Sequence, residues 1–335
     1  MPTAFIQLPY SRIKLHSERL LVLAPAKPGE PDELLQQIPL AELDHLTLTE
    51  EVQITSQAVG ALLRRGVPIC YLDDRGQLLG QTLAASSRHA ATRLAQYRRS
   101  LDPAFSLGVA ARLVAAKIYN QRRLLQRAEG NRPRDLTTEL NRLDQLAARA
   151  ETAASLEELR GVEGAATALF YPAWAGFLPE AFPFEHRSRR PPHNAVNACL
   201  SYAAVILYSE LVAQIHLHGL DPGLGALHST EDGRWSLALD LMEPFRPAAV
   251  EAATLRVFSL GVLDAKDFEP HEGGVYLSLA GRRKFVLQYQ RRLEREFLNE
   301  HTGQRTTLRQ QFATTVVSYK TALDEPDRFQ PFRLN

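Results

Sequence analysis

A carboxylate in an otherwise apolar helical face is the first feature of this sequence that could do chemistry. Ser155 followed by Glu158 is a capping-box pattern, which predicts that a helix begins here. Residues three and four apart are neighbours on a helix, so Glu163 would share a face with Leu159 and Phe170. A carboxylate in such a stripe is costly unless a cation offsets its charge. That cation would be either a metal ion or one of the many arginines.

Two further segments carry an imidazole and a pair of carboxylates. The range Gly219–His228 is a loop rich in glycine and proline that ends in a histidine. Asp240 and Glu243 are three residues apart, which places both carboxylates on one side of a helix. A lone histidine is more often an ordinary polar residue than a ligand, and a capping pair would also explain the carboxylate spacing. Pro244 leaves the local backbone geometry open.

Together these segments supply an oxygen-rich set of groups with one imidazole nitrogen. Such a set suits Mg²⁺ or Mn²⁺ better than zinc. The sequence has no HExxH, no Walker A loop, no GxGxxG after a strand and no GxSxG, which argues against the commoner enzyme classes. The residues are therefore candidates for divalent-metal chemistry, with structural caps and salt bridges as the alternative interpretation.

The sequence pattern divides the chain into two parts. In residues 1–85, alternating or apolar runs predict strands, and helical spacing predicts one helix at 55–64. The expected strands are 12–16, 19–23, 46–49 and 67–72. The range Ala24–Gln37, rich in proline and glycine, predicts an exposed loop. Residues 1–85 therefore predict a small β-rich, sandwich-like domain.

From residue 86 onward a 3.6-residue period takes over, which predicts a larger all-α domain over 86–322. The expected helices are 110–127, 136–150, 156–170, 194–217 and 281–298, with an extended segment at 275–278. Residues 323–335 hold prolines and polar groups and predict a loose tail. The fold class is thus α+β, with a β-rich domain followed by a helical one.

Composition indicates the compartment and the partner. Cys70 and Cys199 are the two cysteines, and neither lies in a redox or metal-type pair, which fits a reducing compartment. We expect a cytoplasmic protein without a membrane partner, because the N-terminus has no signal pattern and the longest apolar stretch is too short. The net charge is +1, yet residues 1–85 carry 7 basic against 10 acidic residues and residues 86–150 carry 13 against 5. A basic middle favours a polyanion, although a solvated helical surface would have the same composition.

Several blocks of the chain, in order, resemble the CRISPR spacer-integrase family, Cas1. They are Ile38–Leu40 with Leu46–Leu48, Lys117–Arg122, Arg160–Gly164, Arg189–Pro192 with Val196–Tyr202, Leu227–His228, Leu239–Pro247 and Gly281–Arg283. The resemblance implies that Glu163, His228 and Glu243 hold the catalytic Mg²⁺ or Mn²⁺ and that Asp240 supports them or is an alternative ligand. The segment after Pro192 departs from the family pattern, but this leaves the implied ligands unchanged.

The family reaction is metal-dependent transesterification, in which a DNA 3′-hydroxyl attacks a phosphodiester, or hydrolysis when water attacks. The resemblance also implies double-stranded DNA partners (a prespacer and the CRISPR repeat), a homodimer formed through the β-rich domains, and the companion protein Cas2. Our candidates for phosphate contacts are Arg122, Arg123, Arg187, Arg189 and Arg190. Three alternatives stay open: a structure-selective repair endonuclease, a mobile-element integrase, and a DNA-binding scaffold without catalysis.

Overall fold

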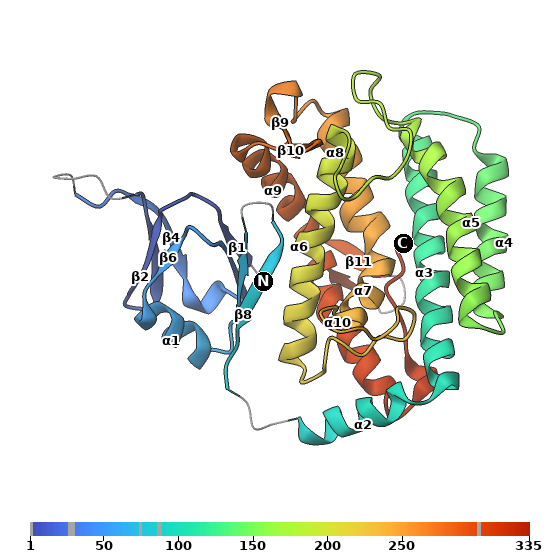
Figure 1. Cartoon of the computed structure of the whole chain (residues 1–335), viewed down its shortest axis with the longest axis horizontal. Coiled ribbons are helices and arrows are strands. Elements are labelled where there is room, and N and C mark those ends of the chain that lie inside the picture. The colour runs from blue at the N-terminus through green and yellow to red at the C-terminus, as the bar shows by residue number, and fades with distance from the viewer. Residues whose placement is uncertain (1–2, 26–30, 74–75, 86–88, 300–302) are drawn as a thin grey trace. The chain divides into compact units, whose positions relative to one another are not determined.

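The computed structural model describes residues 3–25, 31–73, 76–85, 89–299 and 303–335. It divides the chain into two compact units, Met1–His89 and Ala90–Asn335 (Figure 1). The first unit is rich in strands and the second is mostly helical, so the predicted α+β class is confirmed.

The first unit contains two four-stranded sheets, with one helix beside them. One sheet has the order β1-β5-β7-β8 and the other the order β4-β3-β2-β6. The strands are β1 Thr3–Ile6, β2 Arg12–His16, β3 Arg19–Leu23, β4 Leu34–Pro39, β5 His45–Thr49, β6 Gln53–Ile54, β7 Ile69–Leu72 and β8 Leu78–Thr82. Every residue of β5 is buried, because it pairs in parallel with both β1 and β7 and lies inside its sheet.

One expectation about this unit was wrong in part. Residues 26–30 of the predicted Ala24–Gln37 loop lie outside the described residues, but Leu34–Pro39 forms strand β4. β4 is an edge strand with four exposed residues in succession, so it has little of the alternation that marks a strand. Its pairing with β3 is the cause of its conformation. The helix α1 (Ser56–Arg64) begins where predicted, with the Thr55 side chain as N-cap.

The second unit consists mainly of helices, the longest of which are α3, α5 and α6. Its helices are α2 Ala90–Ser100, α3 Pro103–Asn131, α4 Thr137–Glu151, α5 Leu156–Ala175, α6 Ala195–Leu217, α7 Ser236–Met242, α8 Ala252–Ser259, α9 Leu279–Leu293 and α10 Leu308–Ala322. α3, α4 and α5 lie side by side (Figure 1). α6 is long and apolar enough to cross a membrane, but 72% of its most apolar window is buried inside the chain, as in a core helix.

Short elements complete the two units, η1 in the first and the others in the second. They are the 3₁₀ turns η1 Leu40–Glu42, η2 Glu243–Phe245, η4 Ala265–Asp267 and η5 Pro326–Arg328, the π-helical turn η3 Arg246–Glu251, and the strand pairs β9 Phe268–His271 with β10 Gly274–Leu277 and β11 Phe297–Asn299 with β12 Gln304–Thr306. α7, η2, η3 and α8 follow one another without a break, so the chain changes helical pitch three times between Met242 and Ala252.

Two predictions about the C-terminal third were wrong. The helix expected over 281–298 ends at Leu293, because residues 297–299 pair with a strand later in the chain. The segment expected to form a loose tail is packed, with Phe329, Phe332 and Leu334 exposing 2%, 4% and 5% of their surface. Phe332 stacks on Phe245, with ring centroids 4.7 Å apart. This contact joins the last residues to the turn η2.

Candidate active site

Glu163 is presented by α5, whose start the sequence predicts correctly. Ser155 is the N-cap and its hydroxyl accepts a hydrogen bond from the backbone N–H of Glu158. Leu159 and Phe170 are fully buried on the same face, whereas the Glu163 side chain is 23% exposed. Glu163 therefore lies at the edge of the apolar stripe, where a carboxylate can reach both a buried partner and the surface.

Glu243 is the first residue of the turn η2. Its side chain is more buried than that of Glu163 and less buried than that of Asp240. Its side chain is 9% exposed, and its Oε2 atom lies 2.5 Å from Lys117 Nζ and 3.9 Å from Arg246 Nε. Burial would raise the pKa of Glu243, but Lys117, Arg246 and His228 outweigh it and lower the pKa to about 2. Glu243 is thus ionised throughout the neutral range.

Lys117 on α3 is the residue that sequence reasoning missed. Its ammonium lies 2.6 Å from Glu163 Oε1 and 2.5 Å from Glu243 Oε2, and its side chain is 9% exposed. Burial would lower the pKa of Lys117, but Glu243 and Glu163 raise it overall, so the ammonium stays charged. A lysine inside the apolar run Ala115–Ile118 was the signal that could have identified it.

His228 is held by Asp240, which is fully buried at the last turn of α7. Asp240 Oδ1 accepts from the His228 backbone N–H at 3.0 Å and lies 2.6 Å from His228 Nδ1. Asp240 Oδ2 accepts from the backbone N–H groups of Ala226 and Leu227 at 2.5 and 2.9 Å. A carboxylate can only accept here, so it favours the tautomer with the proton on Nδ1 and leaves Nε2 with a free lone pair.

This geometry separates the roles of the two carboxylates that were expected side by side. Asp240 directs both oxygens to the loop before His228, and Glu243 directs its carboxylate to Lys117 and Arg246. Gly225 is required for the close approach of the loop, since a Cβ at this position would lie 2.6 Å from the His228 carbonyl oxygen. Both oxygens of Asp240 are thus taken by the loop that ends at His228.

The predicted ligands come close together without forming a ready-made metal cage. Glu163 and Glu243 share Lys117, and His228 is near enough to Glu243 to lower its pKa. Within the described part of the chain, no group of three or more histidine, cysteine or acidic residues has metal-binding geometry. Glu243 Oε2 is buried and lacks a partner in hydrogen-bond geometry although it is ion-paired. Two carboxylates and one imidazole lone pair fit a hard divalent cation.

A second layer of buried charge stands behind Glu243. Arg246 lies 3.6 Å from Glu251 Oε1, which also accepts a hydrogen bond from the Tyr171 hydroxyl at 3.0 Å. Both Arg246 and Glu251 are buried within the π-helical turn η3. This network holds Arg246 close to Glu243, and π-helical turns are frequent at functional sites.

The structure gives the five predicted phosphate-binding arginines different surroundings. Arg122 bonds to the Leu140 carbonyl and pairs with Asp144, and Arg123 bonds to Gln126. Arg187 is half-buried, and its guanidinium donates to Asn197 and Ser201 at 3.0 Å. Burial, as the largest cause, lowers the pKa of Arg187 to about 10. Arg189 and Arg190 are exposed in the loop before α6.

A set of arginines that the sequence did not single out has no compensating charge. Within the described residues, no carboxylate forms an ion pair with Arg256, Arg292 or Arg295. Burial first, and then the neighbouring charges of Arg127, Arg256 and Arg295, lower the pKa of Arg292 to about 10. Arg292 Nε also donates to the carbonyl of Ala248 in η3, so this set lies against the same turn as Arg246. Arg256 and Arg295 are exposed and Arg292 is partly buried near them, and the described part of the chain supplies no carboxylate counter-ion to this basic cluster.

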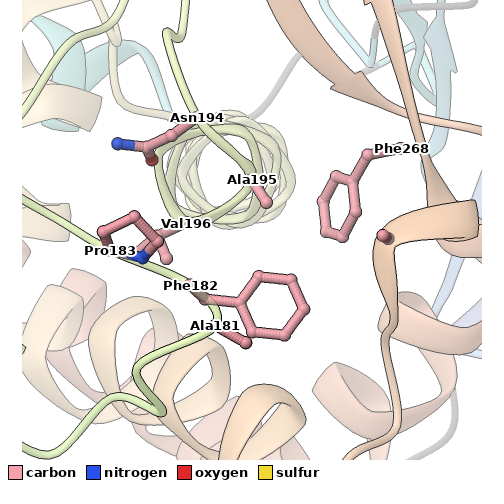
Figure 2. Close-up of a pocket in the computed structure, with 8 residues that line it drawn as sticks. Ala181, Phe182, Pro183, Asn194, Ala195, Val196 and Phe268 are labelled. Atoms are coloured by element: carbon pink, nitrogen blue, oxygen red, sulfur yellow. The ribbon is translucent and has the colours of Figure 1, made fainter.

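A separate pocket of about 250 Å³ lies at the start of α6 (Figure 2). Phe182 and Phe268 line it with ring centroids 6.5 Å apart, and Asn194 is its most polar member. Its lining contains neither a carboxylate nor an imidazole, so it offers nothing for the chemistry of the ligand set.

The chain matches proteins of one family over most of its length. A family model described as CRISPR associated protein Cas1 matches residues 4–291. A Cas4/Cas1 exonuclease–endonuclease fusion of Rhodospirillum rubrum is 36% identical over 84% of this chain, which spans about half (49%) of that protein. CRISPR-associated endonuclease Cas1 3 of Thermus thermophilus is 34% identical over 90% of this chain and 89% of its own length.

Solved structures have the same architecture. A casposase bound to its integration product matches with a TM-score of 0.81 at 24% identity, over 96% of this chain and 90% of that chain. A chain of a Cas6-RT-Cas1–Cas2 complex matches with a TM-score of 0.78 at 25% identity, over 99% of this chain and 36% of that chain. Since the family model covers most of the chain and the Thermus relative aligns almost end to end, the chain belongs to the family of the CRISPR-associated protein Cas1.

Proposed function

We propose that this protein is a divalent-metal-dependent DNA integrase and endonuclease that inserts short DNA duplexes at a CRISPR repeat. The observation that carries the proposal is the convergence of Glu163 and Glu243 on one buried ammonium, next to a histidine whose Nε2 lone pair is kept free by Asp240. A structural salt bridge between Lys117 and the two carboxylates would not need a histidine whose tautomer is set by a contact between its Nδ1 atom and a buried carboxylate.

In the joining reaction a DNA 3′-hydroxyl oxygen bonds to the phosphorus of a target phosphodiester. The bond from that phosphorus to the old 3′-oxygen breaks, and the hydroxyl proton is balanced by protonation of the departing oxygen. Glu163, Glu243 and His228 would hold Mg²⁺ or Mn²⁺, which would supply positive charge to stabilise the reacting phosphate. Water in place of the hydroxyl gives cleavage.

The protein residues supply position and charge balance. Asp240 fixes the orientation and tautomer of His228, as a carboxylate partner commonly does for a histidine ligand. Arg160 donates to the Leu227 carbonyl at 3.2 Å, so α5 and the His228 loop are tied together. Phosphoryl transfer depends largely on the alignment of the reacting groups, so contacts that fix the positions of Glu163 and His228 would favour the reaction.

Long tracks of DNA must also be held, and we assign this task to arginines that have no carboxylate partner among the described residues. The uncompensated charges of Arg256, Arg292 and Arg295 are better candidates than Arg122, Arg123 and Arg187, which have protein partners. Arg189 and Arg190 remain candidates because they are exposed. We further propose a cytoplasmic homodimer formed through the first unit and assembled with Cas2, because one structural relative belongs to a complex that contains Cas2.

The test is strand transfer into a supercoiled plasmid carrying a CRISPR repeat, with a short duplex bearing free 3′ ends, Cas2, and Mg²⁺ or Mn²⁺. The wild type should join DNA, and Glu163→Gln and His228→Ala should not. Glu157→Gln is the matched control, since Glu157 is exposed in the first turn of the same helix.

Three other outcomes would support a different function or a different site. Metal-dependent nicking of branched DNA without joining would favour a repair endonuclease. DNA binding without either reaction would favour a scaffold. Joining by the His228→Ala protein at the wild-type rate would refute the assigned site.

A further inference from the structure

One ammonium stands between the two carboxylates that are proposed to hold the metal. Lys117 Nζ lies 2.6 Å from Glu163 Oε1 and 2.5 Å from Glu243 Oε2, and among the described residues it is the closest cation to both. Two buried carboxylates close together repel each other and resist desolvation. Lys117 therefore stabilises the carboxylate pair by contacting the same oxygen atoms that a divalent cation would need.

A divalent cation bound to these oxygens would repel the ammonium. Like charges a few ångströms apart in a partly buried site repel by several kcal/mol at an effective dielectric of about 20. Arg246 adds further positive charge, because its Nε atom lies 3.9 Å from Glu243 Oε2 and its guanidinium is paired with Glu251. Cation binding should thus displace Lys117 from at least one carboxylate.

The carboxylate pair reaches the surface through Glu163, because the Glu163 side chain is 23% exposed whereas the side chains of Lys117 and Glu243 are each 9% exposed. A lysine carries its charge on a flexible four-carbon stem and can shift by rotamer change. A displaced ammonium near this surface would lack a counter-ion until an anion arrived there.

We propose that Lys117 couples metal binding to DNA binding. In the free protein its ammonium competes with the divalent cation for Glu163 and Glu243, and a DNA phosphate at the exposed edge of Glu163 gives the ammonium another partner. This inference rests on the proposed function and adds to it a thermodynamic device. By linkage, DNA strengthens metal binding and metal strengthens DNA binding by the same factor.

The experiment measures Mn²⁺ affinity by the electron paramagnetic resonance signal of free Mn²⁺, with and without a duplex whose 3′ ends are blocked. The proteins are the wild type, Lys117→Met and Lys284→Met. Lys284 is the matched control, because it forms an ion pair of 2.9 Å with Asp267 outside the ligand set. Allosteric couplings usually correspond to roughly 5- to 150-fold changes in affinity.

We expect Lys117→Met to bind Mn²⁺ about tenfold more tightly than the wild type when DNA is absent, a change within that usual range. The duplex should tighten Mn²⁺ binding by the wild type and by Lys284→Met by a similar factor, and should leave Lys117→Met almost unchanged. Equal Mn²⁺ affinity of Lys117→Met and the wild type would overturn the competition. Tighter binding with an undiminished DNA effect would overturn the coupling.

Two additional variants keep the result unambiguous. Lys117→Gln removes the charge but can donate hydrogen bonds to the carboxylates, so it serves if Lys117→Met does not fold, and the same affinities are expected of it. The double variant Glu163→Gln/Glu243→Gln tests the metal site itself. If it binds Mn²⁺ as tightly as the wild type, the proposed function fails, whereas a failure of the coupling alone leaves that variant weak.

Discussion

Replacing Asp240 with asparagine should disable the site through His228 while keeping the size of the side chain. Asp240 accepts two contacts on each oxygen, at 2.5 and 2.9 Å on Oδ2 and at 3.0 and 2.6 Å on Oδ1. An amide group has one acceptor oxygen, so its NH₂ must face two of these donors in either orientation. Each buried donor left without an acceptor costs about 1–3 kcal/mol, or about 2–6 kcal/mol together.

The less costly accommodation is a change of the imidazole tautomer. If the new NH₂ faces His228 Nδ1, that nitrogen becomes the acceptor and the proton moves to Nε2. The protonated Nε2 cannot bind a metal, so we expect Mn²⁺ affinity to fall about 10- to 100-fold, as for other partners of metal-binding histidines. Joining activity should fall with it.

Three measurements check the role of Asp240: Mn²⁺ affinity, strand transfer and the melting temperature. After the tautomer change only the His228 backbone N–H lacks an acceptor, so the expected loss is about 2 kcal/mol, which at about 2–4 °C per kcal/mol lowers Tm by roughly 6 °C. Asp267→Asn is the control, because Asp267 is a buried carboxylate that binds Lys284 and the Asp264 backbone outside the site. It should destabilise the protein and leave Mn²⁺ affinity unchanged. Wild-type Mn²⁺ affinity in Asp240→Asn would refute the role given to Asp240.

Two other predictions concern charge. The pKa of Glu243 is lowered to about 2, so its ionised form stabilises the fold above the unfolded-state pKa of about 4.3, and this contribution of roughly 3 kcal/mol should disappear as the pH falls from 5 to 2. Urea unfolding of the wild type and Glu243→Gln over this range measures the difference. The second prediction concerns a variant in which alanine replaces Arg256, Arg292 and Arg295. For duplex DNA, its slope of log Kd against log salt should be lower than that of the wild type by about 0.9 for each phosphate that the variant no longer neutralises.

The arginine prediction has a control of equal charge. Arg149, Arg305 and Arg328 are exposed and each pairs with a carboxylate, at 3.1, 3.3 and 2.9 Å respectively. Their triple alanine variant should keep the wild-type salt slope. Equal slopes for the two triple variants would remove the first set from the DNA track. A stability difference between wild type and Glu243→Gln that is constant down to pH 2 would likewise contradict the depressed pKa.

Sequence reasoning succeeded where a structure depends on neighbours along the chain. The N-cap at Ser155 and the strands Arg12–His16 and Arg19–Leu23 follow from local patterns, and the structure has them at the predicted positions. It failed where a distant partner decides. Leu34–Pro39 and Phe297–Asn299 are strands because other strands pair with them, and the latter overrode a helical pattern.

The same distinction applies to the site. The spacing of Asp240 and Glu243 predicted a shared helical side, but the loop before His228 takes one carboxylate and α3 takes the other. Lys117 lies in a block that resembles the family, yet the sequence assigned it no role. Its partners are 46 and 126 positions away in the sequence, so no local pattern could reveal them.

The common support of the site is the helix α3, on which Lys117 and Asn120 are neighbours because they are three residues apart. Asn120 Nδ2 donates to the carbonyls of Pro244 and Phe332, at 2.7 and 3.0 Å, and its Oδ1 accepts from the backbone N–H of Leu334 at 2.6 Å. One face of α3 thus supplies Lys117, which neutralises Glu243, and Asn120, which holds the backbone of Pro244 and of the C-terminal segment. Since Asn120 is fully buried, that segment cannot detach without leaving these groups unpaired. The residues expected to be a loose tail therefore belong to the framework that aligns the candidate active site.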